Sequence, residues 1–391
     1  MTSVAVRPDP FALSEEERGV RDLAREFAQR ELAPTVAQRD DEERYDRSLF
    51  TRMGELGLTA IPYPETYGGA GLSSFAWVLA CEEIAAVDMG MAVSLSVHVL
   101  AQLCIFSAGS DAQKERLLPP MAAGSHLGAF ALTEPQSGSD AAALSLRADR
   151  TDDGYELTGT KVWITNGGDA DTYVVFATVD RSKGREGITA FAVERDTPGF
   201  RIGSHERKMG IRDSSSAELV FEGARVPPDA RLGEEGQGLK VALGSLGAGR
   251  VSIAAACTGL ARAALEHAAR YATQRVQFGR PIADQEMIQS MLADAAVAVD
   301  AARLLTWRAA RLRDAGKPIN AAGSMAKLFA SDTAMRVATD AVQIYGGAGY
   351  SRDNPVERFM RDAKGAQIYE GTNQVQRLII AQQLIEDLRR S

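Results

Sequence analysis

The amino-acid sequence predicts an α+β protein of three domains, with a β-rich domain between two helical ones. Hydrophobic residues recur at helical spacing in the first third and again in the last part of the chain, whereas short runs of β-forming residues fill the middle. At 391 residues, 45% of them hydrophobic, the chain is long enough for several domains that each bury a core. We expect the domains at 1–127, 128–233 and 234–391.

The first domain is expected to consist of helices. Ser14 and Glu17 match a capping box, in which each side chain accepts a hydrogen bond from the other residue's backbone N–H at the start of a helix. Pro34 is expected to end that helical run, because proline lacks the N–H that an interior helical position needs. A glycine-rich turn then leads to further helices, expected at 73–86 and 91–108.

One apolar run in this domain is long enough to cross a bilayer. No Asp, Glu, Lys or Arg occurs from Met89 to Ser110. Ser94, Ser96 and His98 interrupt the run, and polar side chains are costly in lipid. We therefore expect a helix buried in protein and no membrane span.

The middle domain is expected to be a small antiparallel barrel or sandwich. Turn signals such as Asp-Asp-Gly and Asn-Gly-Gly separate short β-type runs, which fall at 155–157, 160–165, 172–179, 188–193 and 218–221. From about residue 234 the chain returns to Ala- and Leu-rich helical periodicity. Long helices are expected there at 251–273, 287–315, 321–341 and 375–388.

Charge, cysteine and histidine usage narrow the class of protein. A formal net charge of −8 disfavours nucleic-acid binding, which depends on Lys and Arg at phosphates. The three cysteines form no Cys-x-x-Cys pair, and the four histidines show no metal-ligand spacing, so we expect neither a disulfide framework nor a metal site. The first ten residues lack the apolar core of a signal peptide. These features together predict a cytoplasmic protein.

The segment 130–140 contains the first candidate site. It places hydroxyls, a proline and a glycine directly after an apolar strand, and such a turn can present several donors to an oxyanion or to the edge of a flavin. An ordinary solvated turn explains the same composition. The glycine-rich segments elsewhere match neither a dinucleotide-binding fingerprint nor a Walker loop.

A second candidate site lies on the strand at 160–165. Because side chains alternate between the faces of a strand, Trp163 and Thr165 are expected to point to the same side, which would suit a flat heteroaromatic ligand. A core tryptophan next to a strand-end threonine is the alternative.

A third candidate is Glu370, which precedes Gly371 and an amphipathic helix. The helix N-terminus favours the carboxylate, whereas burial among Ile368 and Tyr369 favours the neutral acid. We expect burial to dominate when a ligand binds, which would raise the pKa of Glu370 and make it a stronger general base. An acid that merely stabilises the start of the helix is the alternative.

Five motifs in this order give the chain a recognisable signature. They read LTEPQSGSD, KVWITNGG, RVQFGRPI, QIYGGAGY and IYEGTNQ, and on them the chain resembles the acyl-CoA dehydrogenase family from about Glu15 to its end. The resemblance implies a helical domain, a central antiparallel β-barrel and a C-terminal four-helix bundle. It also implies FAD as the cofactor, an acyl-CoA substrate, electron-transfer flavoprotein as the acceptor, and a homotetramer.

The resemblance also implies roles for individual residues. Glu370 would remove the α-proton of the acyl-CoA while a hydride leaves the β-carbon, and its backbone N–H would polarise the thioester carbonyl. Four residues would contact the substrate, namely Ser139, Arg250, Tyr369 and Gly371. The FAD contacts would be Phe130, Leu132, Thr133, Ser139, Trp163, Thr165, Thr372 and Gln374, and Arg275, Phe278, Gln285, Gln343 and Gly347 would reach the FAD of a neighbouring subunit.

Four positions qualify this resemblance. Some relatives carry the base at the position of Gly249, which leaves Glu370 as the base here. Gly247 replaces a common aspartate, which would remove one pantetheine contact, and Glu286 stands beside Gln285 where a glutamine is usual, which would place a negative charge near the cofactor. The position where relatives specific for glutaryl-CoA carry an arginine matches Ala92, which favours an uncharged acyl chain.

Four further points stay open from the sequence alone. Ser94, Ser96 and His98 are candidates for the floor of the acyl pocket, and Arg250 is alternatively a helix-start arginine paired with a surface acid. An acyl-CoA oxidase, which passes its electrons to oxygen, is the main functional alternative, and a non-catalytic helical scaffold is a weaker one. Chain length and branching of the acyl group are undetermined.

Overall fold

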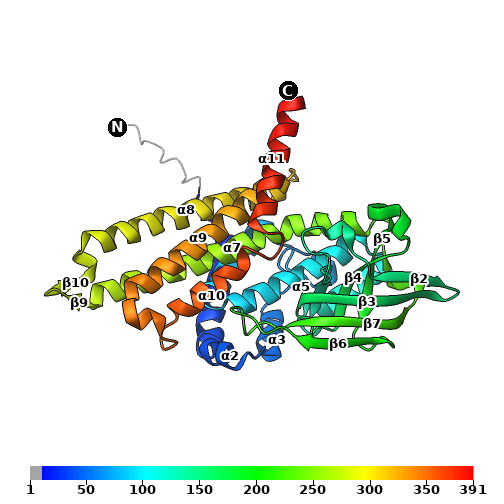
Figure 1. The fold of residues 1–391 in the computed structure, drawn as a ribbon, viewed down its shortest axis with the longest axis horizontal. Coiled ribbons are helices and arrows are strands. Elements are labelled where there is room, and N and C mark those ends of the chain that lie inside the picture. Colours follow the sequence, from blue (N-terminus) through cyan, green and yellow to red (C-terminus); the bar gives the residue numbers. More distant parts are fainter. Residues whose placement is uncertain (1–10, 391) are drawn as a thin grey trace.

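The computed structural model describes residues 11–390, so the segment 1–10, where no signal peptide is expected, lies outside the described residues. Figure 1 shows a β-sheet at one end of the molecule and long helices at the other, with α5 running between them. The order of helices, then strands, then helices is the one predicted from the sequence, and the mostly helical architecture with a central sheet is confirmed.

The N-terminal helices begin where the sequence provides side-chain caps. Ser14 and Glu17 form the expected capping box, with Glu17 N–H to Ser14 Oγ at 3.1 Å and Ser14 N–H to Glu17 Oε2 at 2.8 Å. Ser73 accepts from Ala76 N–H at the next predicted start. The helices are α1 (Glu15–Phe27), a π-helical turn (Ala28–Leu32), α2 (Val36–Glu42), α3 (Arg47–Glu55), α4 (Ser74–Ala85), α5 (Met89–Ala108) and α6 (Asp111–Ala122).

Helix α5 is buried in protein, as its polar side chains predicted. By length and composition, α5 and α7 are the two helices among residues 11–390 that are apolar enough to cross a membrane, but 83% and 78% of their apolar windows are buried inside the protein. The hydroxyl of Ser94 donates to Asn166 Oδ1 at 2.6 Å, and His98 Nδ1 accepts from the backbone N–H of Gly128 at 2.9 Å. The polar groups of α5 therefore join the helix to the sheet.

The middle region is an open sheet, which corrects the expectation of a closed antiparallel barrel. Its order is β6-β7-β3-β2-β4-β5-β8, β1 pairs with β4 in parallel, and the outermost strands β6 and β8 do not pair with each other. Strand β8 contributes only two residues, too few to close the sheet. The strands are β1 (Gly128–Ala131), β2 (Arg147–Thr151), β3 (Gly154–Thr165), β4 (Thr172–Thr178), β5 (Ile188–Glu194), β6 (Phe200–His205), β7 (Ser216–Val226) and β8 (Arg231–Leu232).

The C-terminal region is built on two long helices that pack through small side chains. Fully buried alanines such as Ala254 and Ala261 on α7 and Ala330 and Ala334 on α9 line the contact. This region also contains α10, which the sequence analysis did not anticipate. The helices are α7 (Gly238–Gln274), α8 (Glu286–Asp314), α9 (Asn320–Tyr345), α10 (Val356–Ala366) and α11 (Asn373–Arg390), and a two-stranded hairpin, β9 (Val276–Gln277) and β10 (Arg280–Pro281), connects α7 to α8.

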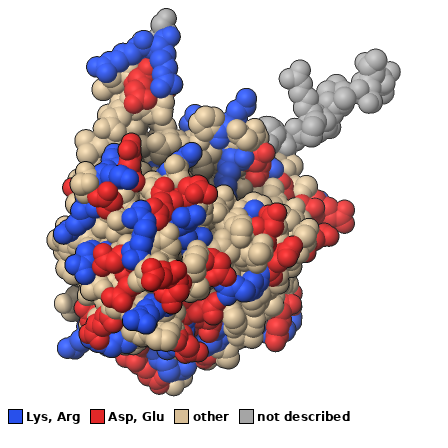
Figure 2. Space-filling model, turned by 90° about the vertical axis from the view of Figure 1, so that its right-hand side faces the viewer, with Lys and Arg blue, Asp and Glu red and all other residues tan. Residues whose placement is uncertain are grey.

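The surface carries charges of both signs. Figure 2 shows basic and acidic residues interspersed over the sheet end of the molecule, without a broad patch of one sign on that face. A surface with interspersed charges of both signs does not produce a broad positive potential on that face.

Candidate active site

A cavity of about 770 Å³ lies where the sheet meets the helices. The end of β1, the end of β3, one side of α5, the first half of α7 and the segment after α10 all contribute to its wall. Three of the five sequence motifs line this cavity, although they are up to 240 residues apart in the chain. The cavity therefore exists only in the assembled tertiary structure.

Most of the candidate residues border this cavity. They are Phe130, Leu132, Thr133, Ser139, Trp163, Thr165, Arg250, Tyr369, Glu370, Gly371 and Thr372. The aromatic plate of Trp163 is 58% exposed, so a flat ligand has an uncovered surface to stack on.

Trp163 and Thr165 of β3 reach the same wall of the cavity through an irregularity in the strand. The register of β3 with β7 shifts between Lys161 and Ile164, and Trp163 has a φ of +60°. A regular strand would also place residues 163 and 165 on one face, but it would leave Trp163 paired in the sheet. The bulge instead turns the indole out of the sheet and towards the cavity.

The remaining candidates lie elsewhere. Gln374 is exposed on α11. Arg275, Phe278 and Gln285 lie in and beside the β9–β10 hairpin, which Figure 1 shows at the far end of the long helices from the sheet, and Phe278 is 95% exposed. Gln343 and Gly347 flank Tyr345, whose ring stacks on Tyr271 with centroids 4.0 Å apart, next to the same hairpin. Within one chain none of these six residues lines the cavity.

Glu370 has an unusual environment. Both carboxylate oxygens are buried and have no hydrogen-bond partner in the described part of the chain. Burial raises the pKa of this carboxyl from 4.5 to about 7, and the cations Arg250 and Lys327 partly oppose that rise. A carboxylate held near neutrality and without a donor is well suited to accept a proton.

The backbone around Glu370 is equally specialised. Glu370 has a φ of +54° and Gly371 a φ of +87°, so two consecutive residues adopt left-handed conformations. This geometry costs free energy for a glutamate and is maintained by contacts around it. Within residues 11–390 the Glu370 N–H has no acceptor, so it remains available to a ligand carbonyl.

Gly249 on α7 makes room for the carboxylate. A Cβ atom at this position would lie 2.5 Å from Glu370 Oε2. Any larger side chain at position 249 would therefore compete with Glu370 for the same space, which explains physically why one of the two positions carries the acid and the other a glycine.

Arg250 does not start a helix and is not paired with a surface acid, so that alternative is wrong. It lies in the middle of α7, is only 6% exposed, and its Nη1 donates to Asn320 Oδ1 at 2.9 Å. Its Nε is buried without a partner, and burial lowers the pKa of the guanidinium from its ordinary value. Arg250 thus brings a positive charge to the cavity wall beside Glu370.

The turn after β1 is held by a second buried acid rather than by solvent. Lys161 Nζ donates to Glu134 Oε1 at 2.7 Å and to the Leu132 carbonyl at 3.0 Å. The backbone N–H groups of Ser145 and Leu146 donate to the same carboxylate, at 2.6 and 3.0 Å. This network fixes the strip from Leu132 to Ser139 that borders the cavity.

Sequence reasoning missed one wall of the cavity and misassigned another. The loop 207–214 lines it and is anchored by the buried Arg39, which bridges Asp88 at 2.6 Å and Asp213 at 2.7 Å. No local pattern signals a contact between residues 39 and 213.

Contrary to the expectation from the sequence, the hydroxyl and imidazole side chains of α5 do not form the floor of the cavity. Ser94, Ser96 and His98 are engaged in hydrogen bonds between helix and sheet or helix and helix. The α5 residues on the cavity are Val93, Val97 and Leu100. The wall of the cavity on this side is therefore apolar.

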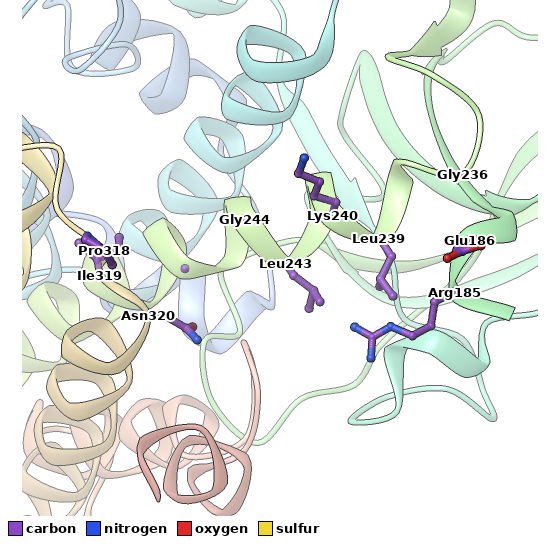
Figure 3. A pocket seen from close by; sticks show the side chains of 11 residues that line it. Arg185, Glu186, Gly236, Leu239, Lys240, Leu243, Gly244, Pro318, Ile319 and Asn320 are labelled. Atoms are coloured by element: carbon purple, nitrogen blue, oxygen red, sulfur yellow. The ribbon is translucent and has the colours of Figure 1, made fainter. Parts of the chain in front are cut away.

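A second, more open cavity of about 650 Å³ adjoins the first along α7. Leu243 borders both cavities. Figure 3 shows Leu243 and Arg185 on the same side of α7, with Asn320 at the start of α9. A ligand extended past Leu243 would pass from the apolar cavity into this polar groove.

Three family models match almost the whole chain. They are described as acyl-CoA dehydrogenase N-terminal, middle and C-terminal domains, and they match residues 14–125, 129–224 and 236–385. An acyl-CoA dehydrogenase of Bacillus subtilis (strain 168) is 48% identical over 374 residues, which cover 95% of this chain and 99% of that protein.

Two solved structures resemble this fold closely. Butyryl-CoA dehydrogenase from Megasphaera elsdenii matches with a TM-score of 0.95 and 46% identity, over 96% of this chain and 100% of that one. A structure described under electron transferring flavoprotein of Acidaminococcus fermentans and flavin-based electron bifurcation matches with a TM-score of 0.95 and 48% identity, over 96% and 99% of the two chains.

Proposed function

The chain belongs to the acyl-CoA dehydrogenase family, and we propose that it converts short-chain acyl-CoA thioesters to trans-2-enoyl-CoA with Glu370 as the base. One observation carries the assignment of the base. The Glu370 carboxylate is buried without a partner on the same cavity as the exposed face of Trp163.

FAD is the cofactor of this family, and the residues present fit it. The bulge at Trp163 leaves an aromatic face uncovered on the cavity wall, and Thr133 and Thr165 add hydroxyls beside it. Phe130, Leu132, Thr133, Trp163 and Thr165 would hold the ring, with Ser139, Thr372 and Gln374 as further contacts. When bound, FAD supplies the acceptor for the hydride that leaves the β-carbon of the substrate.

The residues of the chain supply the proton chemistry and the positioning. The Glu370 carboxylate takes the α-proton, and the Glu370 N–H donates to the thioester carbonyl on which negative charge develops. Ser139, Arg250, Tyr369 and Gly371 would contact the thioester and its carrier. The apolar wall from α5 excludes water, which strengthens each of these interactions.

Two features favour a short, uncharged acyl chain. The similar enzyme from Megasphaera elsdenii is a butyryl-CoA dehydrogenase. Helix α5 closes the cavity with Val93, Val97 and Leu100 and contains no charged residue, so a distal carboxylate on the acyl chain would find no partner there. The polar groove beyond Leu243 would take the outer part of the carrier, with Arg185 near its phosphates.

Electron-transfer flavoprotein is the proposed electron acceptor. The resemblance to a protein from the Acidaminococcus fermentans electron-transfer work supports this choice. An acyl-CoA oxidase would instead pass electrons to oxygen. Comparison of hydrogen peroxide yield with reduction of electron-transfer flavoprotein distinguishes the two activities.

A homotetramer is the proposed assembly. Large apolar side chains are exposed on the helices and the hairpin of the C-terminal region, namely Phe278, Met287, Val297, Tyr350 and Leu384. Burial of such side chains against other subunits would remove apolar surface from water. It would also bring Arg275, Phe278, Gln285, Gln343 and Gly347 to the cofactor of a neighbour.

The cytoplasm is the proposed location of the protein. The three buried free thiols are in keeping with this reducing compartment.

The decisive test is anaerobic reduction of the bound flavin by butyryl-CoA. The wild-type chain should bleach, whereas Glu370→Gln should retain FAD and bind the thioester but react about a hundred- to ten-thousand-fold more slowly, because a general base typically contributes that much. Thioesters of longer and dicarboxylic acids, run in parallel, test the chain-length proposal. Rapid bleaching of the flavin in Glu370→Gln would contradict the role of Glu370 as the base.

A further inference from the structure

A second buried cation lies behind the Glu370 loop. Lys327, on α9, is fully buried, and its Nζ donates to the Gly371 carbonyl and to Asn373 Oδ1, each at 2.9 Å. In the described part of the chain no carboxylate lies within 4 Å of this ammonium. A buried charge with only neutral acceptors is costly, so its retention needs a reason.

Glu370 presents the complementary problem. Its carboxylate is buried without a donor, whereas Lys327 is buried without an acid, and Lys327 contacts the carbonyl of Gly371, the residue that follows Glu370. Each charge offsets part of the other's burial cost through the short loop that separates them. Each of the two charges therefore costs less free energy to bury in the presence of the other.

The same contacts hold the unusual backbone of the loop. The Gly371 carbonyl accepts from Lys327 and also from Gln376 Nε2 at 2.9 Å, and Gln376 donates to the Glu370 carbonyl at 3.2 Å. Asn373, the second acceptor of Lys327, donates to Asp332 at 2.7 Å. The left-handed pair at residues 370 and 371 is thus tied to α9 from behind.

We propose that Lys327 is a positioning residue for Glu370: its ammonium holds the loop 370–373 in its left-handed form and places a positive charge behind the carboxylate. This inference rests on the proposed role of Glu370 as the base. The Lys327 ammonium donates to the Gly371 carbonyl and to Asn373, and it acts on the reaction through the geometry and ionisation of Glu370.

The groups around Lys327 define what its removal would do. Cys257 and Arg250 face it from α7, Asp332 from its own helix, and Glu370 from the loop. Burial raises the pKa of the Cys257 thiol to about 12, so that group stays neutral, and Asp332 forms an ion pair with Arg377 at 3.2 Å. Burial lowers the pKa of Lys327 to about 8, so its charge is present in the range where Glu370 titrates. Loss of that charge raises the pKa of Glu370 further.

The test compares Lys327→Met with Arg377→Met in the FAD-loaded enzyme. Arg377 is an exposed cation that also contacts this network, donating to the Asn373 carbonyl at 3.1 Å, so it controls for loss of a solvent-screened charge. In Lys327→Met we expect the acidic limb of the kcat profile to move up by about one pH unit and kcat at pH 7 to fall about fivefold, with KM changed less than about threefold. Arg377→Met should leave the limb in place.

A second readout does not depend on catalysis. Backbone hydrogen exchange of the segment 370–376 should become at least about tenfold faster in Lys327→Met, while exchange in the β-sheet is unchanged. If Lys327→Met does not accumulate as folded protein, Lys327→Gln, which keeps a donor but not the charge, is measured in the same way.

The outcomes separate this inference from the proposed function. Unchanged exchange in 370–376 overturns the positioning role, and faster exchange with an unmoved limb overturns the electrostatic role. If Glu370→Gln keeps its activity, the base assignment fails by itself, whatever the exchange experiment shows. A loss of stability without either specific change would identify Lys327 as an ordinary core residue.

Discussion

Two glutamates with buried carboxylates lie on segments that line the same cavity, and they have opposite properties. Glu134 lies in the turn after β1 and Glu370 in the loop before α11. Burial disfavours ionisation at both. At Glu134 the ammonium of Lys161 and backbone N–H groups outweigh burial and lower the pKa, whereas at Glu370 burial prevails and the pKa rises to about 7.

The two carboxylates differ in their donors. Glu134 accepts from Lys161, from Leu146 and from both the N–H and the hydroxyl of Ser145. Glu370 accepts from no donor in the described part of the chain and has cations only at a distance. A fully bonded carboxylate stabilises the fold, whereas a carboxylate without donors is free to react. The comparison separates a structural acid from a reactive one.

The largest expected effect tests the structural half of this comparison. Lys161→Met leaves Glu134 buried and without its cation, so the free energy of unfolding should fall by about 3–5 kcal/mol. Glu370→Gln removes a carboxylate that has no donor, and it should change the same quantity by less than about 1 kcal/mol. Denaturant unfolding of the two holoenzymes measures both. Equal losses would mean that the two acids do not differ as described.

The next effect tests the space around the reactive acid. Gly249→Ala places a methyl group against the Glu370 carboxylate, so kcat should fall about 10- to 100-fold through displacement of the base. Gly19→Ala is the control, because a Cβ there meets no atom within 4 Å. It should leave kcat unchanged. Full activity of Gly249→Ala would show that the carboxylate can move without loss of function.

The pH dependence of the wild-type enzyme tests whether the pKa of Glu370 is raised while that of Glu134 is lowered. A base must be ionised, and the Glu370 pKa of about 7 lies above its ordinary 4.5, so activity should be lost as pH falls below about 7. Well below that value, kcat/KM for butyryl-CoA should fall about tenfold per pH unit. Glu134 stays ionised over this range and should add no limb. If activity were instead lost only near pH 4.5, hydrogen-bond donors would have to stabilise the Glu370 carboxylate.

The smallest effect concerns a single donor of the structural acid. Ser145→Ala removes the hydroxyl that donates to Glu134 at 2.9 Å but keeps the N–H bond, so stability should fall by only about 1 kcal/mol. Ser351→Ala, which removes a hydroxyl from the exposed Asp353, should cost less than about 0.5 kcal/mol. A shift in the denaturation midpoint of both variants measures the difference. Indistinguishable values would argue against the buried network.

The sequence analysis predicted the order of structural elements well because that order depends on local periodicity. Helices α4, α5, α8 and α9 fall close to their expected ranges, as does strand β5. The pieces expected at 155–157 and 160–165 form one strand, β3, and α10 was not anticipated. The closed barrel was also wrong, because closure depends on whether two distant edge strands meet.

Three of the motifs identified residues that gather at the cavity, but not what each of them touches. The sequence by itself determined the helical and β periodicities, the capping box at Ser14 and the signature that marks the family, since each is contained in a short stretch of chain. Only the tertiary structure decided that Lys161 reaches Glu134, that no donor reaches Glu370, and that Lys327 lies behind Gly371. The physical reason is that a carboxylate's reactivity depends on the donors around it, and those donors come from segments far apart in the chain.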